Sequence, residues 1–149
     1  MSTASVITNT RRKAIVHFIS SNATGGNVTA NLAYGPANII YKAANGDNFQ
    51  TFDEPNAVAS IKGITYSLNG TAHIERWYSN SDRENVLILG AGSGDFELNG
   101  ISYNQKANAN LRVTFHGTTQ GFITLDVHKE AGFDDPDTQS LQARDRGPF

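Results

Sequence analysis

A glycine-rich stretch at residues 89–94 contains the residue types that most directly suggest chemistry. It reads Leu-Gly-Ala-Gly-Ser-Gly and follows a short apolar run. Such a loop cradles a phosphate when a helix follows it, because the helix N-terminus then faces the ligand. Asp95 occupies the place of the third glycine of the dinucleotide fingerprint, and residues 96–101 alternate like a strand. We therefore interpret the stretch as a connection between two strands and predict no cofactor site.

The four histidines could bind a metal ion only if the fold brings them together with a further ligand. His116 and His128 could meet across a hairpin formed by residues 111–129, but no third ligand is identifiable for that pair. No histidine lies within metal-ligand spacing of another along the sequence. We predict no metal site and interpret all four as ordinary strand residues, namely His17, His73, His116 and His128.

Carboxylates and a serine are the remaining candidates for catalysis. Glycoside hydrolysis needs two carboxylates about 5–9.5 Å apart, a separation that sequence spacing does not test. Carboxylates near turns are typical of solvated or capping positions. Ser93 lacks the strand-to-helix elbow that activates a nucleophilic serine. The five carboxylates that could supply such a pair are Glu75, Asp82, Glu84, Asp95 and Glu97. We predict that none of them is catalytic and that the protein is not an enzyme.

Composition excludes several classes of partner. The 149 residues include no cysteine, so neither a disulfide framework nor a thiolate metal site is available. A net charge of −2 gives no bulk attraction to nucleic acid or to an anionic membrane. No apolar run approaches the roughly 20 residues that span a bilayer. We expect partners that are neither nucleic acid nor membrane.

Three Asn-Gly dipeptides predict tight turns between strands: Asn45-Gly46, Asn69-Gly70 and Asn99-Gly100. A two-residue turn at Asn99-Gly100 would place Leu98 opposite Ile101. A three-residue bulged turn at Asn69-Gly70 would place Tyr66 opposite Ala72. The Asn45-Gly46 turn remains ambiguous, with a bulged form that pairs Tyr41 and Phe49 as one possibility.

The sequence predicts an all-β fold, an antiparallel β-sandwich or partly closed barrel of roughly nine or ten short strands. Alternating segments such as residues 28–34 and 121–127 place one apolar face against a core. Residues 11–129 form the predicted sandwich domain. Residues 1–10 and 130–149 contain too few apolar residues to join a core, so we predict N- and C-terminal arms that are disordered or ordered only against a partner.

Read end to end, the pattern resembles small β-rich virion structural proteins of tailed phages, particularly those of marine and cyanobacterial hosts. The motifs that carry the resemblance are residues 9–16, 60–66, 74–77, 92–96 and 123–129. The resemblance implies strand and turn framework at the tryptophan and Gly-Asp-Phe segments and no catalytic residues. It implies a structural role in the virion without fixing the position in the particle.

We therefore expect a capsid decoration or cement subunit, a homo-oligomer that binds the major capsid protein or other virion proteins. It would be located in the virion, assembled in the host cytoplasm. A neck, tail or baseplate component is the first alternative, and a carbohydrate-binding module with Trp77, Tyr78 or Tyr103 as a sugar platform is the second. The residues expected to bind partners are mostly in the arms: Val6, Ile7, Arg11, Arg12, Phe133, Leu141, Arg144, Arg146 and Phe149.

Overall fold

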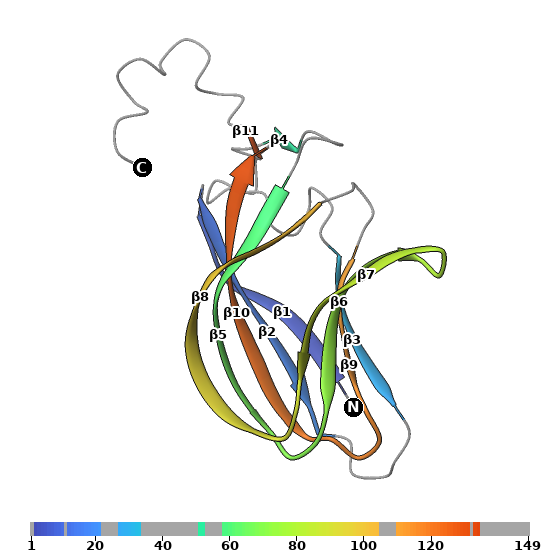
Figure 1. Cartoon of the computed structure of the whole chain (residues 1–149). Coiled ribbons are helices and arrows are strands. Elements are labelled where there is room, and N and C mark those ends of the chain that lie inside the picture. Colours follow the sequence, from blue (N-terminus) through green and yellow to red (C-terminus); the bar gives the residue numbers. More distant parts are fainter. Residues whose placement is uncertain are drawn as a thin grey trace.

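The computed structural model of the chain describes residues 2–10, 12–21, 27–33, 51–52, 58–104, 110–131 and 133–134. All regular structure in these residues is β-strand, and the strands form two antiparallel sheets packed face to face (Figure 1). The predicted all-β fold is confirmed. No strand of the described residues is shared between the two large sheets, so the architecture is a sandwich rather than a closed barrel.

The larger sheet contains five strands in the order β1, β2, β10, β5, β8, and every neighbouring pair is antiparallel. Along β2 the alternate residues Ala14, Val16 and Phe18 are buried, which is the period-two pattern of a strand with one face on a core. The bounds of the five strands are Ser2–Asn9, Lys13–Ser20, Gly121–Ala131, Val58–Leu68 and Gly92–Asn104, in the spatial order just given.

The smaller sheet contains four strands in the order β3, β9, β6, β7, again with antiparallel neighbours. A separate two-stranded pair joins β4 to β11. The bounds are Val28–Ala33, Asn110–Phe115, Ala72–Ser79 and Asp82–Leu89 for the four-stranded sheet, and Thr51–Phe52 and Phe133–Asp134 for the pair.

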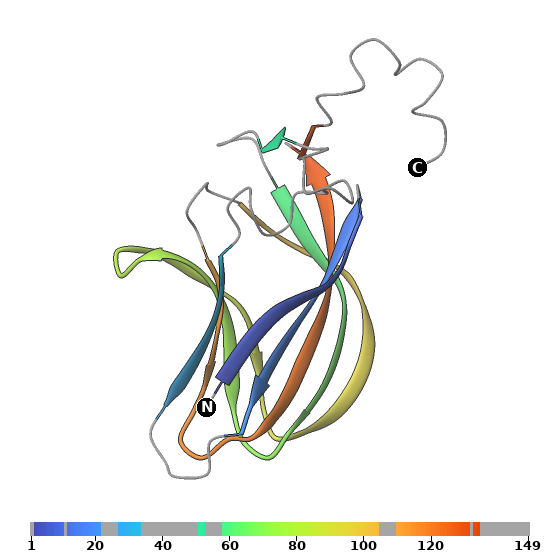
Figure 2. The same cartoon turned by 180° about the vertical axis from the view of Figure 1, so that it is seen from behind.

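The core lies between the inner faces of the two large sheets. The five-stranded sheet contributes Phe18, Ile123 and Leu125, and the four-stranded sheet contributes Ile74 and Phe115, all fully buried. Burial of each such side chain stabilises the fold by about 1.5–3 kcal/mol, which makes this layer the main source of stability. At one side of the sandwich the edge strands β1 and β3 lie next to each other, and Ser2 Oγ donates a hydrogen bond to the carbonyl oxygen of Thr29 at 2.7 Å (Figure 2).

Asn69-Gly70 does not form the predicted hairpin. β5 and β6, the strands that flank it, belong to different sheets, so the dipeptide connects the two layers of the sandwich. A Cβ atom at Gly70 would lie 2.2 Å from Thr119 Oγ1, and this close approach accounts for the glycine. Asn69 Oδ1 accepts a hydrogen bond from the Gln120 backbone at 2.7 Å, which ties the dipeptide to the β9–β10 connection. The predicted pairing of Tyr66 with Ala72 was therefore wrong.

Asn99-Gly100 is also not a hairpin turn. Both residues lie inside β8, which continues from Gly92 to Asn104. The pairing of β8 with β5 jumps from Ile61↔Ile101 to Gly63↔Glu97, so the dipeptide forms an irregularity within one strand. The predicted pairing of Leu98 with Ile101 was wrong. The Asn45-Gly46 turn, with Tyr41 and Phe49, lies outside the described residues.

The glycine-rich stretch connects two strands, as predicted. β7 ends at Leu89 and β8 begins at Gly92, and these strands belong to different sheets. The backbone of Gly92 has φ +137°, a conformation that other residues rarely adopt. A strand stands where a nucleotide fold would require a helix.

The predicted N-terminal arm is part of the sandwich. Ser2–Asn9 form β1, which pairs with β2 from Ser2↔Ser20 to Asn9↔Ala14, and Val6 packs against the core. Two small apolar residues on the inner face suffice for an edge strand, because one neighbouring strand satisfies half of its backbone groups. At the other end β10 continues to Ala131 and β11 follows, so strand structure extends past the predicted boundary at residue 130. Residues 135–149 lie outside the described part of the chain.

Candidate binding surface

The residues predicted to bind partners do not gather on one surface, as far as the structure describes them. Val6 faces the core, whereas Ile7 is 60% exposed at an irregularity of β1. Arg12 is exposed in the turn before β2, where its carbonyl oxygen accepts a hydrogen bond from the Lys129 backbone at 2.7 Å. The backbone of Phe133 pairs with Phe52. The others lie outside the described residues: Arg11, Leu141, Arg144, Arg146 and Phe149.

The outer face of the five-stranded sheet, on the side away from the core, carries three rows of side chains that run across the strands. Strand pairing fixes these rows, because directly opposed residues point to the same face. All three rows cross β2, β10, β5 and β8, in that order. They are Ile19, Phe122, Ser67, Ser93; then His17, Thr124, Thr65, Asp95; then Ile15, Asp126, Gly63, Glu97.

Hydrogen bonds between side chains hold the middle row in place. His17 Nδ1 and Thr124 Oγ1 are 2.9 Å apart, and Thr65 Oγ1 donates to Asp95 Oδ1 at 3.0 Å. The His17 ring also stacks on Phe122 of the first row, with ring centroids 5.8 Å apart. The row is therefore a fixed array of hydroxyl, imidazole and carboxylate groups.

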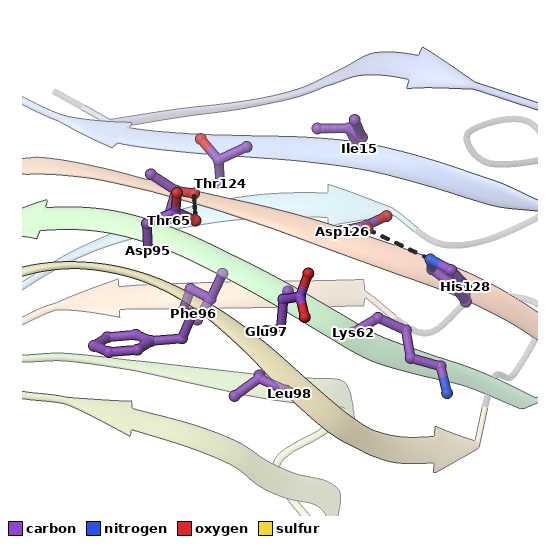
Figure 3. Close-up of a pocket in the computed structure, with 12 residues that line it drawn as sticks. Ile15, Lys62, Thr65, Asp95, Phe96, Glu97, Leu98, Thr124, Asp126 and His128 are labelled. Carbon is purple, nitrogen blue, oxygen red and sulfur yellow. Dashed lines mark hydrogen bonds and ion pairs between the residues drawn. The ribbon is translucent and has the colours of Figure 1, made fainter.

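A groove of about 530 Å³ lies at the second and third rows. Figure 3 shows Asp126 and Glu97 among the residues that line it. Strand pairing places Gly63 between these two carboxylates, where glycine, with no side chain, leaves a gap. The groove is lined by Ile15, Thr65, Thr124 and Asp95, among others. It therefore offers hydroxyl and carboxylate groups beside an aliphatic side chain, a combination suited to noncovalent binding.

Asp126 is the groove residue with capacity for a further hydrogen bond. Its Oδ2 atom lies 3.4 Å from His128 Nε2. Its Oδ1 atom is buried and has no hydrogen-bond partner in the described part of the structure. The side chain as a whole is 36% exposed, so a donor from a bound molecule could reach the accessible part of the carboxylate. A second hollow, of about 440 Å³, adjoins the first row, where Ile19 and Phe122 contribute apolar surface.

The outer face of the four-stranded sheet is filled by its own side chains. Glu75 is only 2% exposed on this face, and its carboxylate accepts a hydrogen bond from Arg112 Nε at 2.8 Å. The Arg112 guanidinium also covers the Trp77 ring, 4.6 Å from its centroid. A smaller hollow, of about 280 Å³, lies on this sheet beside His73 and Arg83.

The sugar platform expected from Trp77 and Tyr78 does not form. Trp77 is half-buried beneath Arg112, whereas Tyr78, its neighbour along β6, is 44% exposed and points the other way because strand side chains alternate. The side chain of Tyr103 lies outside the described part of the structure. The two described aromatic rings therefore cannot form one flat surface.

The structure pairs the histidines differently from the contact of His116 with His128 considered above. His116 lies against His73, with Nε2 and Nδ1 2.7 Å apart, and His128 pairs with Asp126. Residues 111–129 do not form a hairpin within one sheet, because β9 and β10 lie in different sheets. Burial lowers the pKa of His73 below its ordinary value, an effect that the Glu75 carboxylate opposes. The described residues contain no group of three or more potential metal ligands.

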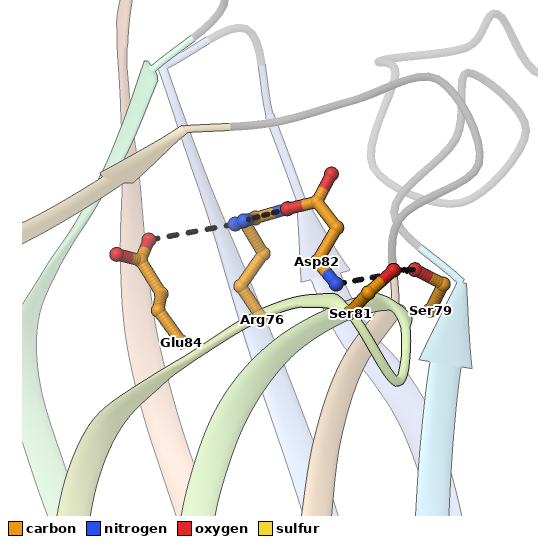
Figure 4. A network of polar contacts seen from close by, with 5 residues as sticks. All are labelled: Arg76, Ser79, Ser81, Asp82 and Glu84. Atoms are coloured by element: carbon orange, nitrogen blue, oxygen red, sulfur yellow. Dashed lines mark hydrogen bonds and ion pairs between the residues drawn. The ribbon is translucent and has the colours of Figure 1, made fainter.

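Two of the carboxylates weighed for catalysis are paired with Arg76. The Arg76 guanidinium donates to Asp82 Oδ1 at 2.8 Å and to Glu84 Oε1 at 3.4 Å (Figure 4). The Ser79 hydroxyl accepts a hydrogen bond from the Asp82 backbone in the turn between β6 and β7. These contacts fix the hairpin and neutralise a buried cation, which is a structural role.

Comparison with known proteins gives no family assignment. No family model matches the chain, and no curated protein matches it. One solved structure, described as "Carbohydrate binding module family29", is similar over 94% of this chain and 99% of its own, with 11% sequence identity and a TM-score of 0.38. A likeness this weak carries no argument about ligand or function. No helix long and apolar enough to cross a membrane occurs in the residues that the structure describes.

Proposed function

We propose that the protein is a non-enzymatic structural subunit of a phage virion, a decoration or cement protein that binds the major capsid protein through the outer face of its five-stranded sheet. The observation that carries the proposal is the groove-bearing face itself, with its ordered hydroxyl, imidazole and carboxylate groups. The resemblance of the sequence to virion structural proteins supports the choice of partner.

The physical character of the face supports a protein partner. Protein interfaces combine an apolar centre with a polar rim and form roughly one hydrogen bond per 100–200 Å². Ile19 is 42% exposed on this face and Phe122 is half-buried beside it, while carboxylates and hydroxyls lie farther along the strands. A partner segment that crosses the rows would meet both kinds of surface.

A structural role also suits the paired carboxylates of the other sheet. Glu75 binds Arg112, and Asp82 and Glu84 bind Arg76. Each of these ion pairs links neighbouring strands of the four-stranded sheet. The chain therefore has a use for these groups that requires no catalysis.

The test is the location and copy number of the chain in purified particles of the phage that encodes it. Quantitative mass spectrometry of intact particles, isolated heads and isolated tails should find the chain in heads, in many copies. Its absence from particles would overturn the proposal. Its presence only in tails would replace decoration with the alternative of a neck, tail or baseplate component.

Glycan binding is the second candidate, and the same groove favours it. Asp95, Asp126 and Thr65 offer acceptors and a donor of the kind that sugar hydroxyls use. The purified chain should be screened against a glycan array and against immobilised polysaccharides. Saturable binding to a glycan, lost when Gly63 is replaced by a larger residue, would favour this candidate over binding to a capsid protein.

A further inference from the structure

Two of the connections that carry the chain between the sheets meet at one end of the sandwich. We call this the crossover end, and it consists of residues 69–71 and 116–120. The two segments are joined by backbone hydrogen bonds, including His116 N to Thr71 O at 2.9 Å and Asn69 N to Gln120 O at 3.1 Å. A hydroxyl from β2 joins them as well, since Ser20 Oγ donates to Thr119 O.

The His73–His116 pair lies beside this end and connects β6 to the residue that follows β9. The two ring nitrogens are 2.7 Å apart, and the ring centroids are 4.8 Å apart at an interplanar angle of 39°. That distance requires one ring to donate and the other to accept. Because a protonated imidazole has two donors and no acceptor, the bond cannot exist when both rings are protonated.

The charges around His73 come from three strands and do not cancel. On β6 the Glu75 carboxylate, 4.0 Å from His73 Nε2, favours a protonated ring. Arg112 on β9 and Arg83 on β7 disfavour it, and Arg112 already holds the Glu75 carboxylate. Glu84 on β7 lines the same hollow but is paired with Arg76. The described residues of β3, Val28–Ala33, include no charged side chain.

We propose that the His73–His116 pair is a proton-sensitive latch for the crossover end. Above the titration range of histidine the pair shares one hydrogen bond and holds β6 to the end of β9. When both rings are protonated the two cations repel each other, and the hydrogen bonds between residues 69–71 and 116–120 open more often.

The direction of the pH effect follows from His73. Burial lowers the pKa of His73 in the folded protein below that of the unfolded chain, whose ordinary value is 6.5. The unfolded chain therefore binds more protons in that range, and stability falls as the pH falls. The stability that neutral His73 contributes is complete at pH values above the pKa of the unfolded chain. It is lost as the pH drops through the pKa of the folded protein. Mild acid is therefore the condition that opens the latch.

The test compares histidine variants on opposite sheets. Urea unfolding of wild type, His73→Gln, His116→Gln and the control His17→Gln would be measured at about pH 8 and about pH 5, the interval in which histidine changes charge. We expect the midpoint of the wild type and of the His17→Gln variant to fall on acidification. Both latch variants should show a smaller fall than the wild type, because glutamine keeps hydrogen-bonding groups without titrating. The part of the fall that comes from Lys129, whose pKa burial lowers to about 7, should remain in all four proteins.

Amide hydrogen exchange of the wild-type chain provides a second readout that needs no variant. After correction for intrinsic rates, protection at His116 and Gln120 should fall at least several-fold more at about pH 5 than protection in the core strand β10. Equal loss of protection across the molecule would overturn the proposal. A latch variant with the full wild-type pH dependence would overturn it too, as would an acid response abolished by His17→Gln.

Discussion

The two outer faces of the sandwich are built on the same strand geometry but differ in how far their own side chains fill them. On the four-stranded sheet, Glu75 and Arg112 bind each other and the guanidinium covers Trp77, so the face is occupied by its own side chains. On the five-stranded sheet, Gly63 leaves a gap between Asp126 and Glu97, and Asp126 Oδ1 has no partner in the described residues.

This difference suggests that one outer face contributes mainly to stability and the other mainly to binding. Side chains that satisfy one another stabilise a fold and present few unmet groups to a partner. A face with a glycine gap leaves room for the side chains of a partner, whereas a face filled by its own side chains does not. We therefore expect mutations on the four-stranded outer face to change mainly the free energy of unfolding, and mutations on the five-stranded outer face to change mainly binding.

The largest effects should come from the core, where the two sheets ought to behave alike. Phe18→Ala in the five-stranded sheet and Phe115→Ala in the four-stranded sheet should each lower the free energy of unfolding by about 3–5 kcal/mol, because both rings are fully buried. Urea denaturation followed by circular dichroism would measure this. A loss below about 1 kcal/mol for either ring would contradict its position in one shared core.

The next largest change in the free energy of unfolding should distinguish two carboxylate substitutions, one on each outer face. Glu75→Gln leaves the Arg112 cation without its counter-charge in a buried site and should cost about 1–3 kcal/mol. Asp126→Asn changes a half-exposed carboxylate opposite a histidine and should stay within about 0.5 kcal/mol. Equal losses in urea denaturation would contradict the distinction between the two faces.

Lys129 should make the protein less stable at neutral pH than at alkaline pH. Burial lowers the pKa of Lys129 from 10.5 to about 7, and its Nζ atom donates to Asn9 Oδ1 at 2.9 Å and to Thr10 O. The unfolded chain binds more protons between these two values, so stability should fall as the pH decreases from about 10.5 to about 7. In Lys129→Met this slope should vanish. Calorimetric melting across that interval would show a flat wild-type profile if the burial had no effect.

The smallest effect on stability should come from Gly63→Ala. A Cβ atom there would meet Asp126 Cβ at 3.5 Å and the Phe96 carbonyl oxygen at 3.6 Å, which are ordinary contacts. We expect unfolding to change by less than about 1 kcal/mol, since alanine also restricts the unfolded chain. The substitution nevertheless narrows the gap between Asp126 and Glu97. We therefore expect Gly63→Ala to reduce the affinity for the partner and to leave the stability intact. Lost stability with unchanged affinity would assign Gly63 to the fold alone.

The sequence predicts the strands better than their partners. Alternation located β3 and β10 closely, because the period-two pattern is visible within one segment. The partner of each strand depends on contacts distant in sequence. The Asn-Gly signal therefore misled at Asn69-Gly70, where tertiary packing against Thr119 uses the glycine for close approach instead of for a hairpin.

The candidate surface was beyond sequence reasoning for the same reason. The alternation of Phe122, Thr124 and Asp126 shows that they share a face of β10. The rows that place Thr65 and Asp95 beside them require the order of the strands in the sheet. The edge strand β1 was missed because its few apolar residues resemble a polar arm when read without the neighbour that pairs with it.

The most direct test of the binding face introduces the same side chain on each outer face. Ile19→Arg lies on the five-stranded sheet and Ile88→Arg on the four-stranded sheet, and both isoleucines are exposed, by 42% and 68%. Under the proposed role in a capsid, each purified variant would be titrated onto phage heads that lack the chain, with folding checked by circular dichroism. We predict that Ile19→Arg weakens binding at least about tenfold, or about 1.4 kcal/mol, and that Ile88→Arg binds like wild type. Wild-type binding by Ile19→Arg, or a larger loss from Ile88→Arg, would contradict the assignment of the binding face.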